Sequence, residues 1–259
     1  MSHFSDIGFA FKNIEEFQAF CEQVVNRGQP LTSPLGYYVR WQAGAGVELW
    51  IQANQTKQLV GCSPHFVGSG EMRVCVTQTF RHPERPMDGS LYAWADPQDD
   101  ANPYSGKFAL AVDLPDFDRV EDRLIQNPTV TLQIAAFADI LRCFPSEAAF
   151  TAEQSEMAPE AFRPGWRKGE RPGEPRPEAI FSGRIRQAEQ RVNPATGQPF
   201  LYALVQTLGG TIDVVADPAT TDGEPVVEGI LAGTFYLSAR VISPLPAFPP
   251  QSTFRRTRS

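Results

Sequence analysis

The segment 193–217 constrains the fold most, because it carries turn residues on both sides of an apolar run. It reads NPATGQPFLYALVQTLGGTIDVVAD. Pro194 suits a type I turn, and Gly197 suits the left-handed position that follows it. A glycine loop that binds phosphate is followed by a helix, whereas Gly209 and Gly210 precede an alternating strand pattern. We therefore predict a two-residue hairpin turn with positive φ at both glycines, and consecutive antiparallel strands.

The composition favours short strands over long helices. The chain has 259 residues, of which 42% are hydrophobic, enough to build two cores. Its 23 prolines and 20 glycines interrupt helices, and its 18 phenylalanines suit strands. We predict a strand-rich α+β protein. An α+β domain with a mainly antiparallel sheet spans 1–156, a Pro/Gly-rich connecting segment spans 157–178, an all-β barrel spans 179–243, and an extended, basic, Pro-rich tail spans 244–259.

The net charge of −7 comes from the first part of the chain. Residues 1–150 contain 11 Lys and Arg against 18 Asp and Glu, and the remainder contains 12 of each, giving totals of 23 and 30. This acidic balance argues against a general polyanion-binding surface on the N-terminal domain. No apolar run reaches the ~20 residues of a membrane span, and the first residues lack the pattern of a secretion signal. We expect a cytoplasmic protein with no membrane partner and four reduced cysteines.

The N-terminal domain is predicted to begin with a strand and a helix. Residues 5–11 alternate apolar with small or polar side chains, which predicts a strand. Asn13 can cap a helix that ends near Gly28, and Glu16 completes a pattern like a capping box. A hairpin is expected across 43–46. Further elements are expected at 71–80, 89–95, 107–113 and 129–144 (strands, the last bent near Ala138) and at 115–125 (a short helix).

Two stretches of the N-terminal domain resemble each other. Residues 7–24 and 108–125 both read as a strand, a short turn and a helix, and their apolar positions match at one offset. An internal duplication is one interpretation of this match. The alternative is that any amphipathic strand and helix in succession give such a match.

The connecting segment 157–178 carries five prolines and three glycines among alternating charges. Such a sequence is predicted to form neither a strand ladder nor a useful length of helix. Phe162 and Trp166 lie within it, and aromatic rings usually pack on an apolar surface. We therefore expect the segment to dock on a domain. The strands expected after it are 180–192, 199–207, 211–216 and 229–242, the last long enough to serve as two.

The distal strands FSGRIRQAEQRVNPATGQPFLYALVQTLGGTIDVVAD and EGILAGTFYLSARVI resemble an OB-fold, a small five-stranded barrel found in single-strand-binding proteins. The helix usual between the third and fourth strands of that family is not visible in this sequence. The resemblance implies a binding face on the second and third strands. Its stacking and charged residues would be Arg184, Arg186, Phe200, Tyr202, Tyr236 and Arg240. Alternatively, Phe200 and Tyr202 share a face with Leu204 and belong to the core.

One set of residues has the types that bind zinc. Cys62, His65, Cys75 and His82 follow one another with spacings that match no standard finger. They form the candidate metal site of this sequence. The alternative is that they are two structural thiols and two loop histidines.

The opening segment IGFAFKNIEEFQAFCEQV is similar to the vicinal-oxygen-chelate superfamily of glyoxalases and extradiol dioxygenases. The resemblance implies paired βαβββ units that hold a divalent metal with His and Glu, and hence Lewis-acid chemistry. The histidine expected in the first strand is absent, because Asp6 stands near that place and His3 precedes it. Lys107 stands at the corresponding place in the second unit.

Other catalytic patterns are missing from the sequence. There is no Gly-x-Ser-x-Gly elbow, and three histidines leave little material for a nucleophile relay. The acidic loop 96–102 lacks the glycine and glutamate of a calcium-binding EF-hand loop. We predict a non-enzymatic binding or protein-interaction protein with no cofactor and an unidentified protein partner. The alternatives are a single-stranded nucleic-acid binder and a metal-dependent glyoxalase-like or dioxygenase-like enzyme. The candidate recognition rings are Trp41, Trp50, Trp94 and Trp166.

Overall fold

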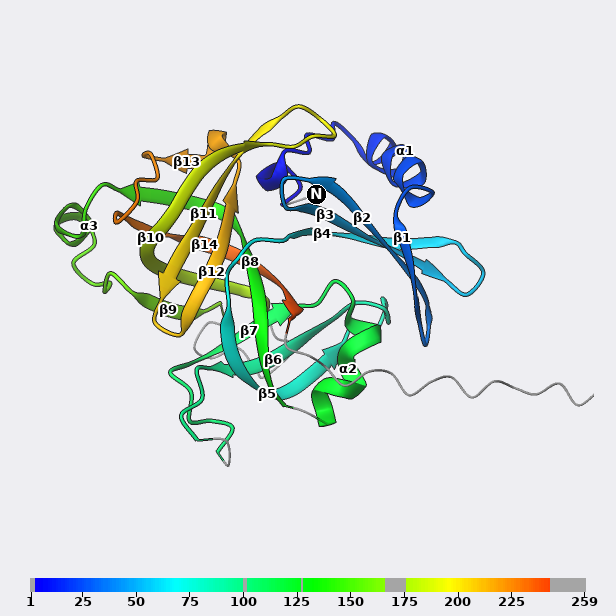
Figure 1. Ribbon diagram of the computed structural model, residues 1–259, viewed down its shortest axis with the longest axis horizontal. Coiled ribbons are helices and arrows are strands. Elements are labelled where there is room, and N and C mark those ends of the chain that lie inside the picture. Colours follow the sequence, from blue (N-terminus) through cyan, green and yellow to red (C-terminus); the bar gives the residue numbers. More distant parts are fainter. Residues whose placement is uncertain (1–2, 100–101, 127, 166–175, 243–259) are drawn as a thin grey trace, which may run out of the picture.

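The computed structural model of the chain describes residues 3–99, 102–126, 128–165 and 176–242. Its helical elements are η1 (Ser5–Ile7), α1 (Ile14–Val25), α2 (Phe117–Gln126), α3 (Glu147–Glu153) and η2 (Pro218–Thr220). Its strands are β1 (Gln29–Ser33), β2 (Gly36–Gly44), β3 (Val47–Asn54), β4 (Leu59–Phe66), β5 (Met72–Arg81), β6 (Gly89–Ala95), β7 (Phe108–Asp113), β8 (Thr129–Phe144), β9 (Ala161–Pro164), β10 (Glu178–Val192), β11 (Pro199–Thr207), β12 (Gly210–Ala216), β13 (Thr221–Asp222) and β14 (Ile230–Val241). The fold is strand-rich and mainly antiparallel, as predicted (Figure 1). The predicted tail at 244–259 lies outside the described residues.

Strands β1 to β4 form an antiparallel sheet, the N-terminal sheet, in which each strand pairs with the next. Its β2–β3 hairpin turns at the predicted place, with positive φ at Gly44, Ala45 and Gly46. Helix α1 packs on one face of this sheet (Figure 1). The predicted cap is confirmed, because the Asn13 side chain accepts a hydrogen bond of 2.9 Å from the backbone N–H of Glu16. Strands β1 and β4 and helix α3 were not predicted from the sequence.

The predicted strand at 5–11 is wrong. Residues Ser5–Ile7 form a 3-10 turn that ends at Gly8 with φ of +79°. The carbonyl of Ile7 accepts a hydrogen bond from the side chain of Asn193, and the carbonyl of Gly8 accepts one from Thr196. The alternating apolar residues thus bury in an aromatic cluster without pairing to a strand. The alternative interpretation of the match between 7–24 and 108–125 therefore describes it better, since the first stretch has no strand.

Five strands close a first ring: β5, β6, β7, β14 and β8. Neighbours β8–β5, β5–β6, β6–β7 and β8–β14 are antiparallel, and β7 meets β14 in parallel at the pair Asp113–Ser238. Helix α2 connects β7 to β8, and its Phe117, Val120 and Leu124 join the hydrophobic cluster inside the ring. The two predicted elements at 107–113 and 115–125 are confirmed.

A second ring consists of β10, β11, β12, β8 and β14. The chain runs back and forth through β10, β11 and β12, β12 pairs in parallel with β8, and β14 pairs antiparallel with both β8 and β10. Strands β8 and β14 thus belong to both rings, as Figure 1 shows at the centre of the molecule. The interiors of the two rings merge into one hydrophobic cluster.

The long strand β8 stays paired with β14 from Leu132–Val241 to Phe144–Ile230. The expected bend near Ala138 is a register irregularity: Ala138 pairs with Phe235, and Ile140 pairs with Thr234. Asp139 therefore has no direct partner in the ladder, which is the geometry of a β-bulge. A bulge increases local twist, so the two ends of each shared strand can serve different rings.

The glycine pair at 209–210 lies at a hairpin, and a strand follows it as predicted. Thr207 pairs with Gly210, so the two turn residues are Leu208 and Gly209. Of the two glycines only Gly210 has positive φ, +153°. A Cβ atom at residue 210 would lie 2.6 Å from the carbonyl oxygen of Glu71. The prediction of positive φ at both glycines is wrong for Gly209, and the turn lies one residue earlier than predicted. Gly210 begins β12 and packs closely against the start of β5.

The connecting segment docks on the rings through a strand. Strand β9 pairs with β10, which contradicts the prediction that this segment forms no ladder. Pro164 is tolerated because β9 lies at the sheet edge. The predicted docking is confirmed by Phe162, whose ring stacks 4.2 Å from Phe108 and 5.8 Å from Phe181. Trp166 lies outside the described residues. Within the described part of the chain, no helix is long and apolar enough to cross a membrane.

The shared strands predict where the fold is most sensitive to substitution. Leu237 on β14 is fully buried in the common cluster. We expect Leu237→Ala to lower the free energy of unfolding in urea by about 2–5 kcal/mol, because it removes apolar contacts and leaves a cavity. Ile140→Thr is the matched control, since Ile140 lies on the same ladder with 60% of its surface exposed. That control is expected to change stability by about 0.5 kcal/mol or less; a comparable loss in both variants would contradict the assignment.

Candidate functional site

The N-terminal sheet has one apolar and one polar face. Val39, Ile51 and Cys62 pack toward α1, and their neighbours along each strand point the opposite way. The buried residues Glu48, Trp50, Gln52 and His65 lie on this second face, which is directed at the two rings. The buried polar groups of this face have to find partners on the rings, because unpaired polar groups are costly in a protein interior.

His65 connects the N-terminal sheet to both shared strands. Its Nδ1 lies 2.9 Å from the hydroxyl oxygen of Ser238 on β14, and its Nε2 lies 3.0 Å from Oε1 of Gln133 on β8. The amide nitrogen of Gln133 donates to the carbonyl of Phe66, so its oxygen faces the histidine. His65 Nε2–H therefore donates to Gln133, and Nδ1 accepts from Ser238.

Asp213 on β12 ends this network. Its carboxylate accepts hydrogen bonds from the backbone N–H groups of Ser69 (3.0 Å) and Gly70 (2.9 Å). The Tyr202 hydroxyl (3.0 Å) and the Gln133 amide (2.7 Å) donate to it as well. Burial nevertheless raises the pKa of Asp213 above its usual range. A Cβ atom at residue 68 would lie 2.1 Å from this carboxyl group, so only glycine lets the loop Gly68–Gly70 approach Asp213 this closely. In the sequence, this loop resembles only a Gly-x-Ser-x-Gly elbow with the wrong spacing, and nothing near it in the chain marks Asp213 as its partner.

A second polar cluster lies beside His65 and contains two arginines on one tryptophan ring. The guanidinium carbon of Arg240, on β14, lies 5.0 Å from the Trp50 ring centre, and that of Arg40, on β2, lies 5.7 Å from it. Both arginines approach the buried Glu48, which also accepts a hydrogen bond of 3.1 Å from the Trp50 indole. Burial opposes ionisation of Glu48, but the Arg40 hydrogen bond and the nearby positive charges lower its pKa.

Three further charged residues extend this cluster toward α2. Asp116 directly precedes α2 and is buried. Burial raises the pKa of Asp116, although the positive charges of Arg240, Arg119 and Arg123 act to lower it. Arg119 donates to the carbonyl of Thr32 at 3.2 Å, and Arg123 donates to the carbonyl of Arg119 at 3.1 Å. We call Arg40, Glu48, Trp50, Asp116, Arg119, Arg123 and Arg240 the arginine junction. It brings four guanidinium groups to two carboxylates.

The arginine junction contains buried polar atoms without partners. Within the described part of the chain, Oδ1 of Asp116 and Nε of Arg240 are buried and make no hydrogen bond. The side chains of Arg40 and Arg240 retain 22% and 24% exposure, so the cluster reaches the surface. A mostly buried cluster that reaches the surface, with excess positive charge and an unpaired donor, is suited to holding an oxyanion.

The four candidate zinc ligands do not form one group. Cys62 packs against the cluster that contains Cys21, and His65 belongs to the network with Gln133 and Ser238. Cys75 is buried on β5, and Nδ1 of His82 accepts hydrogen bonds of 3.2 Å from the backbone of the following turn. Among the described residues, no three His, Cys, Asp or Glu side chains are grouped so that they could hold a metal.

The residues suggested by the oxygen-chelate resemblance are also dispersed. His3 lies 3.3 Å from Asp6 and stacks on Tyr236 at 4.8 Å. Lys107 pairs with Asp96 at 2.8 Å on the first ring. The ligand positions that the resemblance implies in the two units are thus engaged in separate local contacts.

The candidate nucleic-acid residues do not share an open face. Arg184 pairs with Glu147 at 2.6 Å, and Arg186 pairs with Glu228 at 2.8 Å. Phe200 is fully buried beside Phe66. The remaining three lie elsewhere: Tyr202 contacts Asp213, Tyr236 donates to Asp113 at 2.9 Å, and Arg240 belongs to the arginine junction. The core alternative therefore describes Phe200 and Tyr202 better than a stacking face does.

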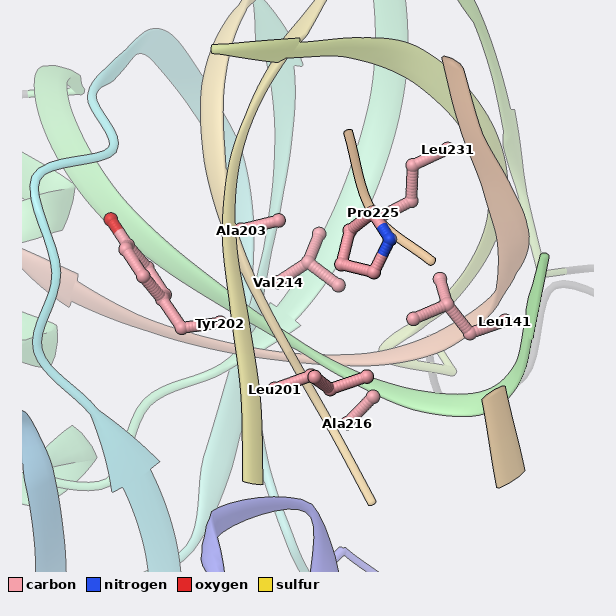
Figure 2. Close-up of a pocket in the computed structure, with 8 residues that line it drawn as sticks. All are labelled: Leu141, Leu201, Tyr202, Ala203, Val214, Ala216, Pro225 and Leu231. Carbon is pink, nitrogen blue, oxygen red and sulfur yellow. The ribbon is translucent and has the colours of Figure 1, made fainter. Parts of the chain in front are cut away.

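The second ring encloses a small apolar cavity. Figure 2 shows the lining residues Leu141, Leu201, Ala203, Val214, Ala216, Pro225 and Leu231 gathered around it, with the Tyr202 ring turned away. Its volume of about 10 Å³ is close to the least that a single water needs. The interior of this ring is therefore a packed core.

The four candidate tryptophans differ in exposure. Trp50 is fully buried in the arginine junction, while Trp41 and Trp94 are partly exposed, and Trp166 lies outside the described residues. Comparison with known proteins adds no further residues, because no protein-family model, curated protein or solved structure matches the chain. The arginine junction is thus defined by its geometry alone.

The buried histidine gives a pH-dependent stability. Burial lowers the pKa of His65 to about 4, from about 6.5 in an unfolded chain. As the pH falls, the unfolded chain takes up this proton before the folded protein does. We expect His65 to contribute stability that is complete above about pH 6.5 and is lost, by about 3 kcal/mol, as the pH falls toward 4. Carboxyl groups with a raised pKa, such as Asp213, act in the opposite direction.

A comparison with His65→Gln isolates this contribution. Glutamine preserves a side chain that donates and accepts hydrogen bonds but does not titrate. Urea unfolding measured between pH 4 and 7 is expected to show a steeper loss of stability on acidification in the wild type, by up to about 1.4 kcal/mol per pH unit. Equal slopes in the two proteins would contradict a neutral, buried His65.

Proposed function

We propose that the protein works by binding a phosphate-bearing partner at the arginine junction and does not catalyse a reaction. The observation that supports this proposal is that four arginines surround two buried carboxylates, and that two of these arginines, Arg40 and Arg240, reach the surface. Guanidinium groups bind phosphate through paired, charge-assisted hydrogen bonds, which are stronger than neutral ones. The other candidate site residues are already paired in local contacts or buried in the core, and this favours the arginine junction as the binding site.

The two unpaired atoms favour a particular oxyanion. Nε of Arg240 is a donor and needs an acceptor, whereas Oδ1 of Asp116 is an acceptor and needs a donor. Hydrogen phosphate and phosphate monoesters near neutral pH present both an anionic oxygen and, in the monoprotonated form, a hydroxyl. Sulfate presents acceptors only. The junction is therefore proposed to prefer phosphate to sulfate.

We propose the rings as the rigid support of this site. We propose that the second ring corresponds to the OB-like barrel expected for 179–243, with β8, which lies outside that range, as its fifth strand. The position between the third and fourth strands of 179–243, where the OB-fold resemblance implies a helix, holds the 3-10 turn η2, whereas α2 connects β7 to β8 in the first ring. Arg119 and Arg123 lie on that helix. We further propose a cytoplasmic location, in keeping with the four free cysteines.

Phosphate binding is tested by calorimetry and thermal unfolding at constant ionic strength. Phosphate and pyrophosphate are expected to bind and to raise the unfolding temperature, with sulfate weaker. Arg240→Met retains the apolar stem over Trp50 but removes the charge. It is expected to weaken phosphate binding by about tenfold or more, because charge-assisted hydrogen bonds are lost.

Arg142→Met is the matched control. Arg142 lies on β8 and pairs with Glu153 and Asp222 away from the junction, so this variant is expected to bind phosphate like the wild type. Absence of phosphate binding to the wild type would refute the proposal. Retention of an oligothymidylate that depends on Arg184 and Arg186 would favour the single-strand alternative. Stoichiometric zinc or iron in protein purified without chelator would favour the metal-dependent enzyme.

A further inference from the structure

We propose that Cys21 and Cys62 form an oxidisable dithiol, a modification site at which a hydroperoxide converts two thiols into a disulfide that ties α1 to β4. Two thiols in contact are a different arrangement from an isolated cysteine, because the second thiol can resolve the oxidised form of the first. This proposal is independent of phosphate binding and is carried by a separate part of the molecule.

The packing of α1 brings the two thiols together. Cys21 points from the helix into the cluster formed with Val39 and Ile51, and it is 4% exposed. Cys62 pairs with Ile51 in the β3–β4 ladder and packs against the same cluster. Both side chains belong to this one cluster, and the two thiols lie close enough to change each other's pKa. They come from elements separated by three strands in the sequence, so their contact is a product of tertiary packing.

The two thiols have different roles in the proposed reaction. The interaction with the Cys62 thiol lowers the pKa of Cys21, against the effects of burial and of Glu22, which favours Cys21 as the attacking thiolate. The same interaction, together with burial, raises the pKa of Cys62, so it remains a thiol. Cys62 is also the more exposed of the two side chains.

The reaction balances with one equivalent of hydroperoxide. The Cys21 thiolate attacks the peroxide O–O bond, which gives a sulfenic acid at Cys21 and releases hydroxide, or an alkoxide from an organic peroxide. The Cys62 sulfur then attacks the Cys21 sulfur and displaces water. With hydrogen peroxide, two thiols and one peroxide give one disulfide and two waters. A thiol reductant such as dithiothreitol reverses the change by disulfide exchange.

The other cysteines provide internal controls. Cys143 lies in the core of the rings, and burial raises its pKa to about 12. A thiolate at Cys143 is therefore rare near neutral pH, and its oxidation is expected to be slow. Cys75 lies on β5, away from α1 and the N-terminal sheet.

The test treats the full chain with stoichiometric hydrogen peroxide, blocks the remaining thiols and maps the peptides by mass spectrometry. We expect a loss of two hydrogen atoms, a cross-linked pair of peptides containing Cys21 and Cys62, and reversal by dithiothreitol. Cys21 is expected to react at least about tenfold faster than Cys143. The disulfide is expected to raise the unfolding temperature by about 10 °C, because it closes a long loop.

Two variants separate the roles of the thiols. In Cys62→Ser, a sulfenic acid at Cys21 is expected to persist and to react with dimedone, with no cross-link. In Cys143→Ser, the cross-link is expected to form as in the wild type. Four unmodified thiols after treatment, oxidation of Cys143 at the rate of Cys21, or a cross-link between other cysteines would each overturn the proposal.

Discussion

The pairing of β8 with β14 is the interaction on which the rest of the structure depends. Both strands belong to the first and to the second ring, and neither ring closes without both of them. The β-bulge opposite Thr234 and Phe235 allows each strand to change its neighbours along its length. Because the two interiors merge into a single hydrophobic cluster, the rings share one core and depend on each other for burial.

The N-terminal sheet depends on that core through polar contacts. His65 is hydrogen-bonded to Ser238 on β14 and to Gln133 on β8, so the position of the N-terminal sheet is fixed relative to both shared strands. Hydrogen bonds have strict directions, and a shifted sheet would leave these buried groups unpaired. The network thus gives the interface a unique geometry. The same interface holds Arg40 and Arg240 against Trp50, and this fixed spacing is what makes the arginine junction a candidate binding site.

Residue type predicted that some candidate residues lie in polar clusters, but it did not predict which residues they contact. Residue types suggested chemistry for His65, Arg240 and Tyr202, and all three do lie in polar clusters. Their partners could not be predicted, because Ser238, Glu48 and Asp213 are far from them in the chain or belong to other elements. Asp116, Arg119 and Arg123 gave no sequence signal, since charged residues near a helix start are usually solvated. Phe200 illustrates the reverse case, in which a ring suited to stacking serves the core.

The sequence by itself determined the local structure. Asn13 and Glu16 define the start of α1, the glycines at 44 and 46 define the β2–β3 turn, and alternating apolar residues define most strands within a residue or two. These features depend on backbone preferences and on hydrogen bonds between residues close in the chain. Only the tertiary structure decided that β12 joins β8 in parallel, that residues 5–7 form a turn rather than a strand, and that four arginines lie around Glu48 and Asp116. Each of these features depends on contacts between segments that are distant in the chain. A local apolar pattern predicts which face of an element is buried, but it does not predict which distant segment packs against that face.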